Sequence, residues 1–179
     1  MELKGFLNLP FGCDKEAVIK EMEENRKAYF ADHRSHDDFL IFERFEFANR
    51  KIEEACFSFV DDKMCRVTLS ICENLSKNIR FIIDAYNQIK KEINNKYYVS
   101  ENDYIKYTPP AYELDDFEKY HSAYIRSNLV EYACYWNFPS EYDEDNYIIL
   151  RIMSDLSTQI TYEHGHLNGE RIKRKQLEW

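Results

Sequence analysis

The chain is poor in glycine, and this scarcity excludes the common phosphate-binding loops. Only four of its 179 residues are glycine, and another four are proline. Neither G-x-G-x-x-G nor G-x-x-x-x-G-K occurs, although such loops need glycine where the backbone approaches a phosphate. The G-x-S-x-G motif of serine hydrolases and the known cysteine-protease signatures are also absent. The sequence therefore argues against an enzyme, and we expect neither catalytic residues nor a cofactor.

Histidine and cysteine form no pattern typical of a metal site. No two cysteines have the C-x-x-C spacing. His164 and His166 form a close pair at a predicted strand end, and His33 and His36 lie in an acidic stretch. A zinc site needs three or four ligands with a supporting shell, and the sequence names no further convincing ligand for either pair. We interpret these histidines as exposed loop residues and expect no metal.

The cysteines indicate a reducing compartment. Their number is odd, and three of them lie inside strand-like runs, where a free thiol behaves as a small hydrophobe. Residues 1–10 have neither a basic region nor a long apolar run, so they predict no signal peptide. A leader removed ahead of Met1 would leave no trace in this sequence. We predict a cytoplasmic location with these thiols reduced: Cys13, Cys56, Cys65, Cys72 and Cys134.

Negative charge dominates, which argues against nucleic acid as a partner. The 33 acidic and 24 basic residues give a net charge of −9. One basic cluster runs from Arg171 to Lys175, and we interpret it as a solvated helix face or tail. A positively charged protein remains a suitable partner, because opposite charges steer association. No apolar stretch approaches the roughly 18 residues that would cross a bilayer, so no membrane span is predicted.

What the chain does have is aromatic residues, at 16%, and clear hydrophobic patterns. Aromatic side chains suit the pleated, half-buried surface of a sheet. Alternating apolar and polar residues predict strands that pack on one face and are hydrated on the other. Six such runs occur, over residues 39–47, 54–59, 65–71, 130–138, 148–152 and 159–163.

Helical patterns precede each group of three strands. Asp14 is placed to cap a helix of about 15 residues, and apolar residues at steps of three and four predict a long core helix over 75–94. Residues 95–128 predict an irregular, tyrosine-rich connection. Within it, a short helix between Leu114 and Ile125 would place Leu114, Phe117 and His121 on one side.

These elements predict an α+β fold in one domain over residues 1–179. We expect an antiparallel sheet of about six strands with helices packed on one face. The order of elements also predicts two α-β-β-β pseudo-repeat halves, 9–72 and 73–164, followed by a charged C-terminal tail over 165–179.

The alternation also predicts which side chains face the helices. Trp136 should be core and its neighbour Tyr135 exposed, because successive residues of a strand point to opposite faces. The inward set is Ala55, Phe57, Phe59, Val67, Leu69, Ile71, Ile148, Leu150, Ile152 and Ile160. The outward, wetter set includes Arg44, Glu46, Glu54, Ser58, Arg66, Thr68, Ser70, Glu131, Tyr135, Arg151, Gln159 and Thr161.

Two segments resemble a group of small bacterial α/β modules. Residues 10–18, Pro-Phe-Gly-Cys-Asp-Lys-Glu-Ala-Val, resemble the start of their first helix, and residues 56–67, Cys-Phe-Ser-Phe-Val-Asp-Asp-Lys-Met-Cys-Arg-Val, resemble their strand pair. The group includes outer-membrane assembly lipoproteins of the SmpA/OmlA type and the tandem-repeat β-lactamase inhibitor protein. The resemblance implies two repeats sharing one antiparallel sheet and a role in binding proteins, with no catalytic residues. This chain has no lipobox, so the resemblance does not extend to membrane assembly.

The leading functional hypothesis is a non-catalytic protein-binding or regulatory protein, with an acidic immunity or inhibitor protein as one concrete form. Tyrosine pairs apolar area with a hydrogen-bonding tip, which suits a binding surface. The alternative is a small-molecule-binding domain or an unassigned enzyme with a pocket near the tyrosine-rich segment 97–125. The residues we expect on the binding surface are Tyr135, Tyr104, Tyr107, Tyr112, Arg66 and Arg151.

Overall fold

The computed structural model describes residues 2–71 and 78–177. Its helices and antiparallel strands confirm the predicted α+β class. The chain divides into two compact units, each built from separate stretches of sequence. Unit 1 comprises Met1–Ser70, Asn137–Ile148 and Thr161–Trp179, and unit 2 comprises Ile71–Trp136 and Ile149–Ile160.

Unit 1 contains the N-terminal elements and the last helix. In chain order these are β1 (Gly5–Phe6), β2 (Leu9–Pro10), α1 (Lys15–Lys20), the π-helix η1 (Glu21–Asn25), β3 (Tyr29–Phe30), the 3₁₀ turn η2 (Asp32–Arg34), β4 (Phe39–Phe47), β5 (Arg50–Val60), β6 (Lys63–Ile71) and α4 (Gly165–Leu177).

Unit 2 contains two helices and the tyrosine-rich segment. Its own elements are α2 (Ile79–Lys96), β7 (Asn102–Tyr107) and α3 (Phe117–Arg126). Three further strands are divided between the units: β8 (Val130–Phe138), β9 (Asn146–Ile152) and β10 (Thr158–Glu163). The last residue of β6, Ile71, also belongs to unit 2.

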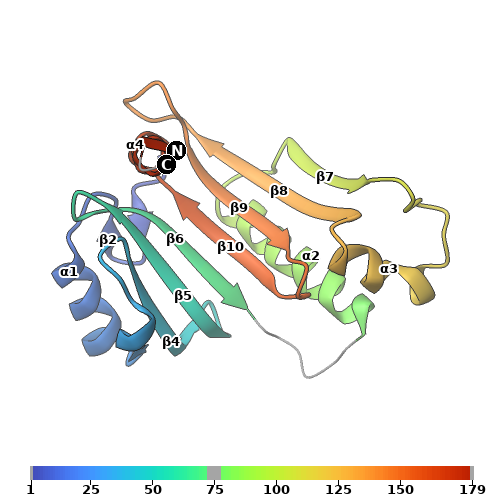
Figure 1. Cartoon of the computed structure of the whole chain (residues 1–179), viewed down its shortest axis with the longest axis horizontal. Helices are drawn as coiled ribbons and strands as arrows, with labels where there is room; N and C mark the ends of the chain where they lie inside the picture. The colour runs from blue at the N-terminus through green and yellow to red at the C-terminus, as the bar shows by residue number, and fades with distance from the viewer. Residues whose placement is uncertain (1, 72–77, 178–179) are drawn as a thin grey trace. The chain divides into compact units, whose positions relative to one another are not determined.

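The larger sheet has eight strands among the described residues, in the order β3-β4-β5-β6-β10-β9-β8-β7, so the prediction of about six is wrong. Figure 1 labels the strands from β4 to β7 of this order. The six predicted runs correspond to β4, β5, β6, β8, β9 and β10. The two extra strands, β3 and β7, are the edges of this order. β3 is only two residues long, and β7 is exposed at all but one position, so neither shows the one-sided alternation of a half-buried strand.

Local signals in unit 1 act as the sequence predicts. The Asp14 carboxylate accepts a hydrogen bond from the Ala17 amide at 2.8 Å and so caps α1, which continues without a break into η1. Strands β4, β5 and β6 form an antiparallel meander joined by two-residue turns. Both turn pairs, Ala48–Asn49 and Asp61–Asp62, have positive φ, as the right-handed twist of such a hairpin requires.

The predicted inward residues are all buried, from Ala55 on β5 to Ile160 on β10. The outward set is correct for Arg66 and Thr68, which are partly exposed, but wrong for Ser58 and Thr161, which are 9% and 5% exposed. Thr161 lies opposite Thr68, and their hydroxyl oxygens are 3.3 Å apart. This part of the outward face of unit 1 is therefore covered.

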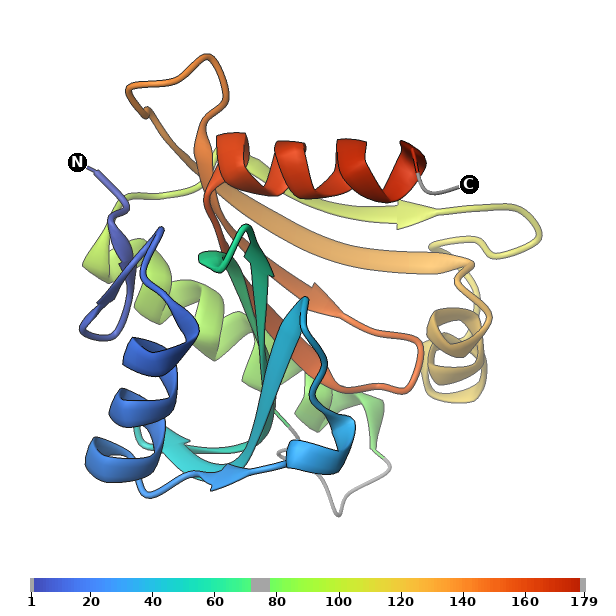
Figure 2. The ribbon, with the colours of Figure 1, turned by 60° about the vertical axis from the view of Figure 1, so that its left-hand side comes forward.

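The cover comes from α4, which forms where a charged tail was predicted. On the inward face, Lys15 of α1 lies over the ring of Phe59 at 5.8 Å. Cys56 points to the outward face. Burial raises the pKa of its thiol, and a hydrogen bond with Ser58 and then the guanidinium groups of Arg66 and of Arg171 in α4 lower it in part. Helices therefore lie on both faces of the unit 1 strands rather than on one. Figure 2 shows α4 passing the β5–β6 turn, where Arg174 pairs with Asp61.

Helix α2 is the core helix of unit 2. The Asn78 side chain caps it by accepting a hydrogen bond from the Arg80 amide at 2.9 Å. The predicted helix start at Leu75 lies outside the described residues. The predicted apolar face is buried, and its members are Ile79, Ile82, Tyr86, Ile89 and Ile93.

Trp136 is fully buried, as predicted. Its indole nitrogen donates to the Asn94 side chain at 2.9 Å and to the Tyr98 carbonyl at 3.1 Å. The polar tip of this large side chain is therefore satisfied, and β8 is fixed to the C-terminal end of α2.

The segment 95–128 is more regular than expected, since it holds both β7 and α3. Asp116 caps α3 by accepting from the Lys119 amide at 3.2 Å. Phe117 and His121 stack on one side of the helix with ring centroids 4.3 Å apart. Leu114 does not join them: it precedes the helix and is 98% exposed, so its assignment to that side is wrong.

No helix in the described part of the chain is long and apolar enough to cross a membrane.

Candidate functional site

Three of the six predicted surface residues meet in unit 2. The rings of Tyr104 on β7 and Tyr135 on β8 stack, with centroids 6.1 Å apart and planes 18° apart. The Arg151 guanidinium lies over the Tyr135 ring at 5.3 Å and donates a hydrogen bond to its hydroxyl. Glu131 completes the group by accepting from the Tyr104 hydroxyl at 3.3 Å. We call these four residues the tyrosine–arginine cluster.

The four side chains of the cluster form one polar network that is partly exposed to solvent. Hydrogen bonding with Tyr135, followed by burial and by the charge of Glu131, raises the pKa of Tyr104 to about 12. Burial is the largest single influence on the pKa of Arg151 and lowers it, but the hydrogen bond to Tyr135 and the charges of Tyr135, Glu131 and Tyr104 together outweigh burial and raise the pKa overall. At neutral pH the Tyr104 phenol is therefore neutral and the Arg151 guanidinium is charged.

The other three predicted residues lie elsewhere. Tyr107 is on the opposite face of β7 from Tyr104, with its ring 6.2 Å from that of His121. Tyr112 is exposed in the loop before α3, where its amide donates to Asp115. Arg66 belongs to unit 1 and pairs with Glu163 at 3.7 Å. Sequence reasoning did not separate Tyr104 from Tyr107, because it assigned residues 102–107 to an irregular connection rather than to a strand.

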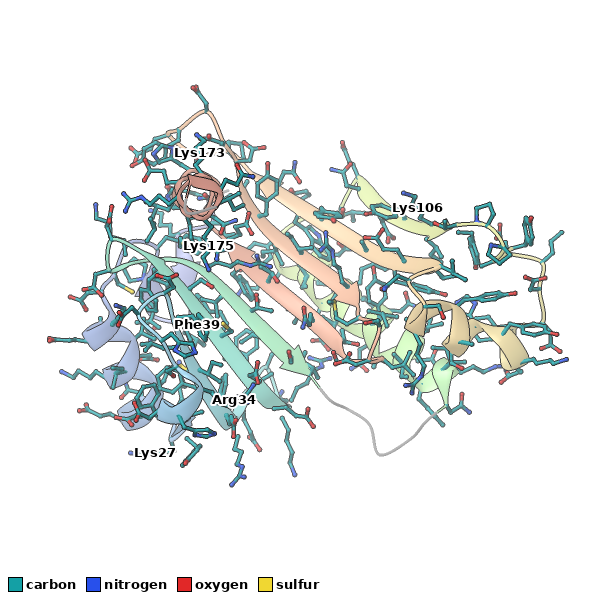
Figure 3. The ribbon with its side chains drawn as sticks, in the orientation of Figure 1. Lys27, Arg34, Phe39, Lys106, Lys173 and Lys175 are labelled. Atoms are coloured by element: carbon teal, nitrogen blue, oxygen red, sulfur yellow. The ribbon has the colours of Figure 1, made fainter. Side chains whose placement is uncertain are left out.

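Strand β7 is the edge of the sheet, and its register fixes which backbone groups face outward. The Thr108 amide donates to the carbonyl of Leu129, the residue directly opposite. Residues of an antiparallel pair alternate between inward and outward hydrogen bonding. Tyr104 and Lys106 therefore bond to β8, while Asp103, Ile105 and Tyr107 direct their N–H and C=O groups away from it. Figure 3 labels Lys106 on this strand.

A pocket of about 320 Å³ lies between β7 and α2. Ile105 is 49% exposed at its rim. Lys90 of α2 reaches across to Asp103 of β7, with the two charged atoms 2.9 Å apart. The residues lining the pocket are Ile83, Tyr86, Asn87, Lys90, Asp103, Tyr104, Ile105, Phe117 and Tyr132.

Two buried tyrosines, Tyr132 and Tyr86, line the inner side of this pocket. The Tyr132 hydroxyl lies 2.7 Å from Nε2 of His121, so both polar atoms are satisfied. Tyr86 is 1% exposed, and its hydroxyl has no hydrogen-bond partner among the described residues. Burial, with the charges of neighbours such as Asp103, raises the pKa of Tyr86 far above its ordinary range. A buried hydroxyl without a partner costs free energy, which a ligand with a polar atom would recover.

The described residues contain no group of three or more side chains suited to hold a metal ion. His166 stacks on Tyr142 at 4.3 Å and contacts Glu144, while His164 packs on Phe11.

The four described cysteines are free. Burial raises the pKa of the Cys65 thiol to about 11, so little nucleophilic thiolate forms at neutral pH. The other three thiol pKa values are raised for the same reason, those of Cys13, Cys56 and Cys134. Cys72 lies outside the described residues.

Sequence reasoning missed Ile105, Lys90 and the role of Glu131. A signal for Ile105 was present: the run Asn-Asp-Tyr-Ile-Lys-Tyr over 102–107 has β-branched and aromatic residues bounded by polar ones. The pairing of Lys90 with Asp103 depends on a contact between distant residues, which one sequence cannot supply.

Comparisons with models of protein families, with curated proteins and with solved structures found no match.

Proposed function

We propose that this chain is a non-catalytic binding protein that holds a basic protein partner through unit 2. The proposed surface consists of the tyrosine–arginine cluster and the edge strand β7. Inhibition of a toxic or enzymatic basic protein is the narrower form of this proposal.

The observation that carries the proposal is the stacked pair of Tyr104 and Tyr135 beside Arg151. Tyrosine and arginine are the residues that most often dominate binding energy at interfaces. Here both rings are held in one orientation before any partner arrives, so binding orders few additional side chains.

Charge supports a basic partner. The stretch 101–118, which contains β7 and leads into α3, has six acidic residues and one lysine. This local excess agrees in sign with the net charge of −9. A negative surface raises the association rate of a positive partner and makes binding weaker at high salt.

Affinity capture from the native lysate tests the proposal, with the full chain as bait at low and moderate salt. The site variants are Tyr104→Ala and Tyr135→Ala. The matched control is Phe81→Ala, which removes a 61% exposed ring from α2. We expect one stoichiometric, basic protein with the wild-type chain and the control, and its loss with both site variants. Equal recovery by all four baits, or no stoichiometric protein at either salt concentration, would contradict the proposal.

A second candidate, a small-molecule site, is favoured by the pocket beside α2. Its volume of about 320 Å³ is at the lower end of the range for small ligands. The Tyr86 hydroxyl, which has no hydrogen-bond partner in the described part of the chain, and the aromatic wall suit an uncharged aromatic molecule with one polar atom. Phenol is a suitable probe: we expect it to raise the melting temperature of the wild-type chain but not of Tyr86→Phe. Equal shifts in both would exclude this use of the pocket.

A further inference from the structure

We propose that the partner contributes an extended, basic segment that adds to β7 as a further strand and places an apolar side chain in the pocket beside Ile105. This inference rests on the proposed function and specifies its binding mode.

The backbone of β7 supplies the first part of the argument. Asp103, Ile105 and Tyr107 direct their N–H and C=O groups away from β8, and β7 ends the strand order of the sheet. An edge with free backbone groups is a template for another strand. Natural edges are commonly blocked by proline, a bulge or charged side chains. β7 has no proline or bulge within its six paired residues, and of its two charged residues Asp103 is paired with Lys90.

The pocket supplies the second part. Ile105 lies opposite Tyr132, on the face of the sheet that α2 covers, and it is half exposed. A strand added beside β7 would point alternate side chains toward that same face. One of them would lie next to Ile105 and enter the pocket formed with Ile83 and Phe117. The pocket therefore suits a single apolar side chain of the added strand.

Charge defines the rest of the segment. Glu101 directly precedes β7 and Asp103 is its second residue, and acidic residues from Glu113 to Glu118 follow its other end. Lysine or arginine on both sides of the apolar residue would meet Glu101 at one end and Glu113 at the other, while Asp103 keeps its ion pair with Lys90. The fitting segment is thus extended, basic and apolar at its centre.

Peptide selection tests this mode directly. The probe is a displayed library of random linear dodecapeptides, selected on the full-length chain. Selected peptides are then measured on Ile105→Pro, which removes one outward N–H at a sheet edge, and on Ile105→Val, which keeps it. We expect selected peptides with a central apolar residue flanked by lysine or arginine. Their affinity should fall about tenfold for Ile105→Pro, the loss of about one hydrogen bond, and about twofold or less for Ile105→Val.

A second measurement uses the wild-type chain, in case Ile105→Pro disturbs the strand itself. This measurement is hydrogen exchange of the backbone amides with and without a selected peptide. The amides of Asp103, Ile105 and Tyr107 should exchange rapidly in the free protein and become protected when a selected peptide binds. Failure to select any peptide, unchanged affinity for Ile105→Pro, or no gain in protection at these amides would each overturn the inference. Capture of a whole partner that depends on Tyr135 but not on Ile105 would leave the proposed function standing without this binding mode.

Discussion

The rings of Tyr104 on β7 and Tyr135 on β8 stack, with their centroids 6.1 Å apart, across the last two strands of the sheet order. Tyr104 comes from a stretch that the sequence assigns to an irregular connection, and Tyr135 from the outward face of a well-patterned strand. Their contact, with the hydrogen bond from Arg151 to Tyr135, holds the outward face of β7 and β8 in one arrangement. That arrangement is the basis of the proposed binding surface.

Trp136 and Tyr135 should differ strongly in their contribution to stability. Trp136→Ala should lower the free energy of unfolding by about 3–5 kcal/mol, because it leaves a large cavity. Tyr135→Ala should cost about 1–2 kcal/mol, since it removes a half-buried ring together with its hydrogen bonds to Arg151 and Tyr104. Denaturant unfolding of both variants measures the difference, and a larger loss for Tyr135→Ala would contradict the assigned facing of β8.

Ile82 should anchor α2 to the core of unit 2. It is 2% exposed, so Ile82→Ala should cost about 2–5 kcal/mol in denaturant unfolding. The neighbouring Phe81 is 61% exposed, and Phe81→Ala is the matched control, with an expected change within about 0.5 kcal/mol. A loss below about 1 kcal/mol for Ile82→Ala would show that this face of the helix is not buried.

The Asp14 cap should stabilise the short first helix. Asp14→Ala removes the acceptor for the Ala17 amide and should cost about 0.5–2 kcal/mol. Asp14→Asn keeps an acceptor oxygen at the same place and should retain most of the stability. Equal losses for the two variants would assign the effect to charge rather than to the cap.

Stability should fall as the pH drops from neutrality. Burial lowers the pKa of His121 and of His164 below the ordinary value of 6.5, so the unfolded chain takes up protons first. Well above pH 6.5 both histidines are neutral in the folded and the unfolded chain, so neither contributes a pH dependence there. As the pH falls below 6.5, protonation of the unfolded chain progressively reduces the free energy of unfolding.

Unfolding measured between about pH 7.5 and 5.5 should therefore show a slope that His121→Gln reduces. Glutamine cannot be protonated in this range but can still bond to Tyr132. The exposed His33 is the control, and His33→Gln should leave the slope unchanged. A slope unaffected by His121→Gln would exclude the buried imidazole as its source.

The parts of the fold that the sequence predicts are those where one face is buried. Strand β6 alternates from Val67 to Ile71 because its inward residues are excluded from water while Thr68 and Ser70 are not. Helix α2 shows its period of three to four for the same reason. In both elements the order of apolar and polar residues shows which face is buried.

The parts that the sequence does not predict depend on distant contacts. Strand β7 is exposed on both faces, so its residues carry no alternation, and its pairing with β8 decides its conformation. Sequence reasoning assigned α4 to a charged tail, because the helix packs on strands that are distant in the sequence. The same holds for the candidate site. Tyr135 and Arg151 lie on strands that the sequence pattern predicts, but their proximity to Tyr104 depends on the pairing of β7 with β8.

Hydrogen exchange of the protein with its captured partner tests the central claim most directly. The account predicts that added protection concentrates on residues 102–107, with the outward amides of Asp103, Ile105 and Tyr107 among the most protected. Helix α1 and the β4–β5 turn, both in unit 1, should be unchanged. Protection confined to unit 1, with the amides of 102–107 exchanging as in the free chain, would contradict the claim that unit 2 carries the binding surface.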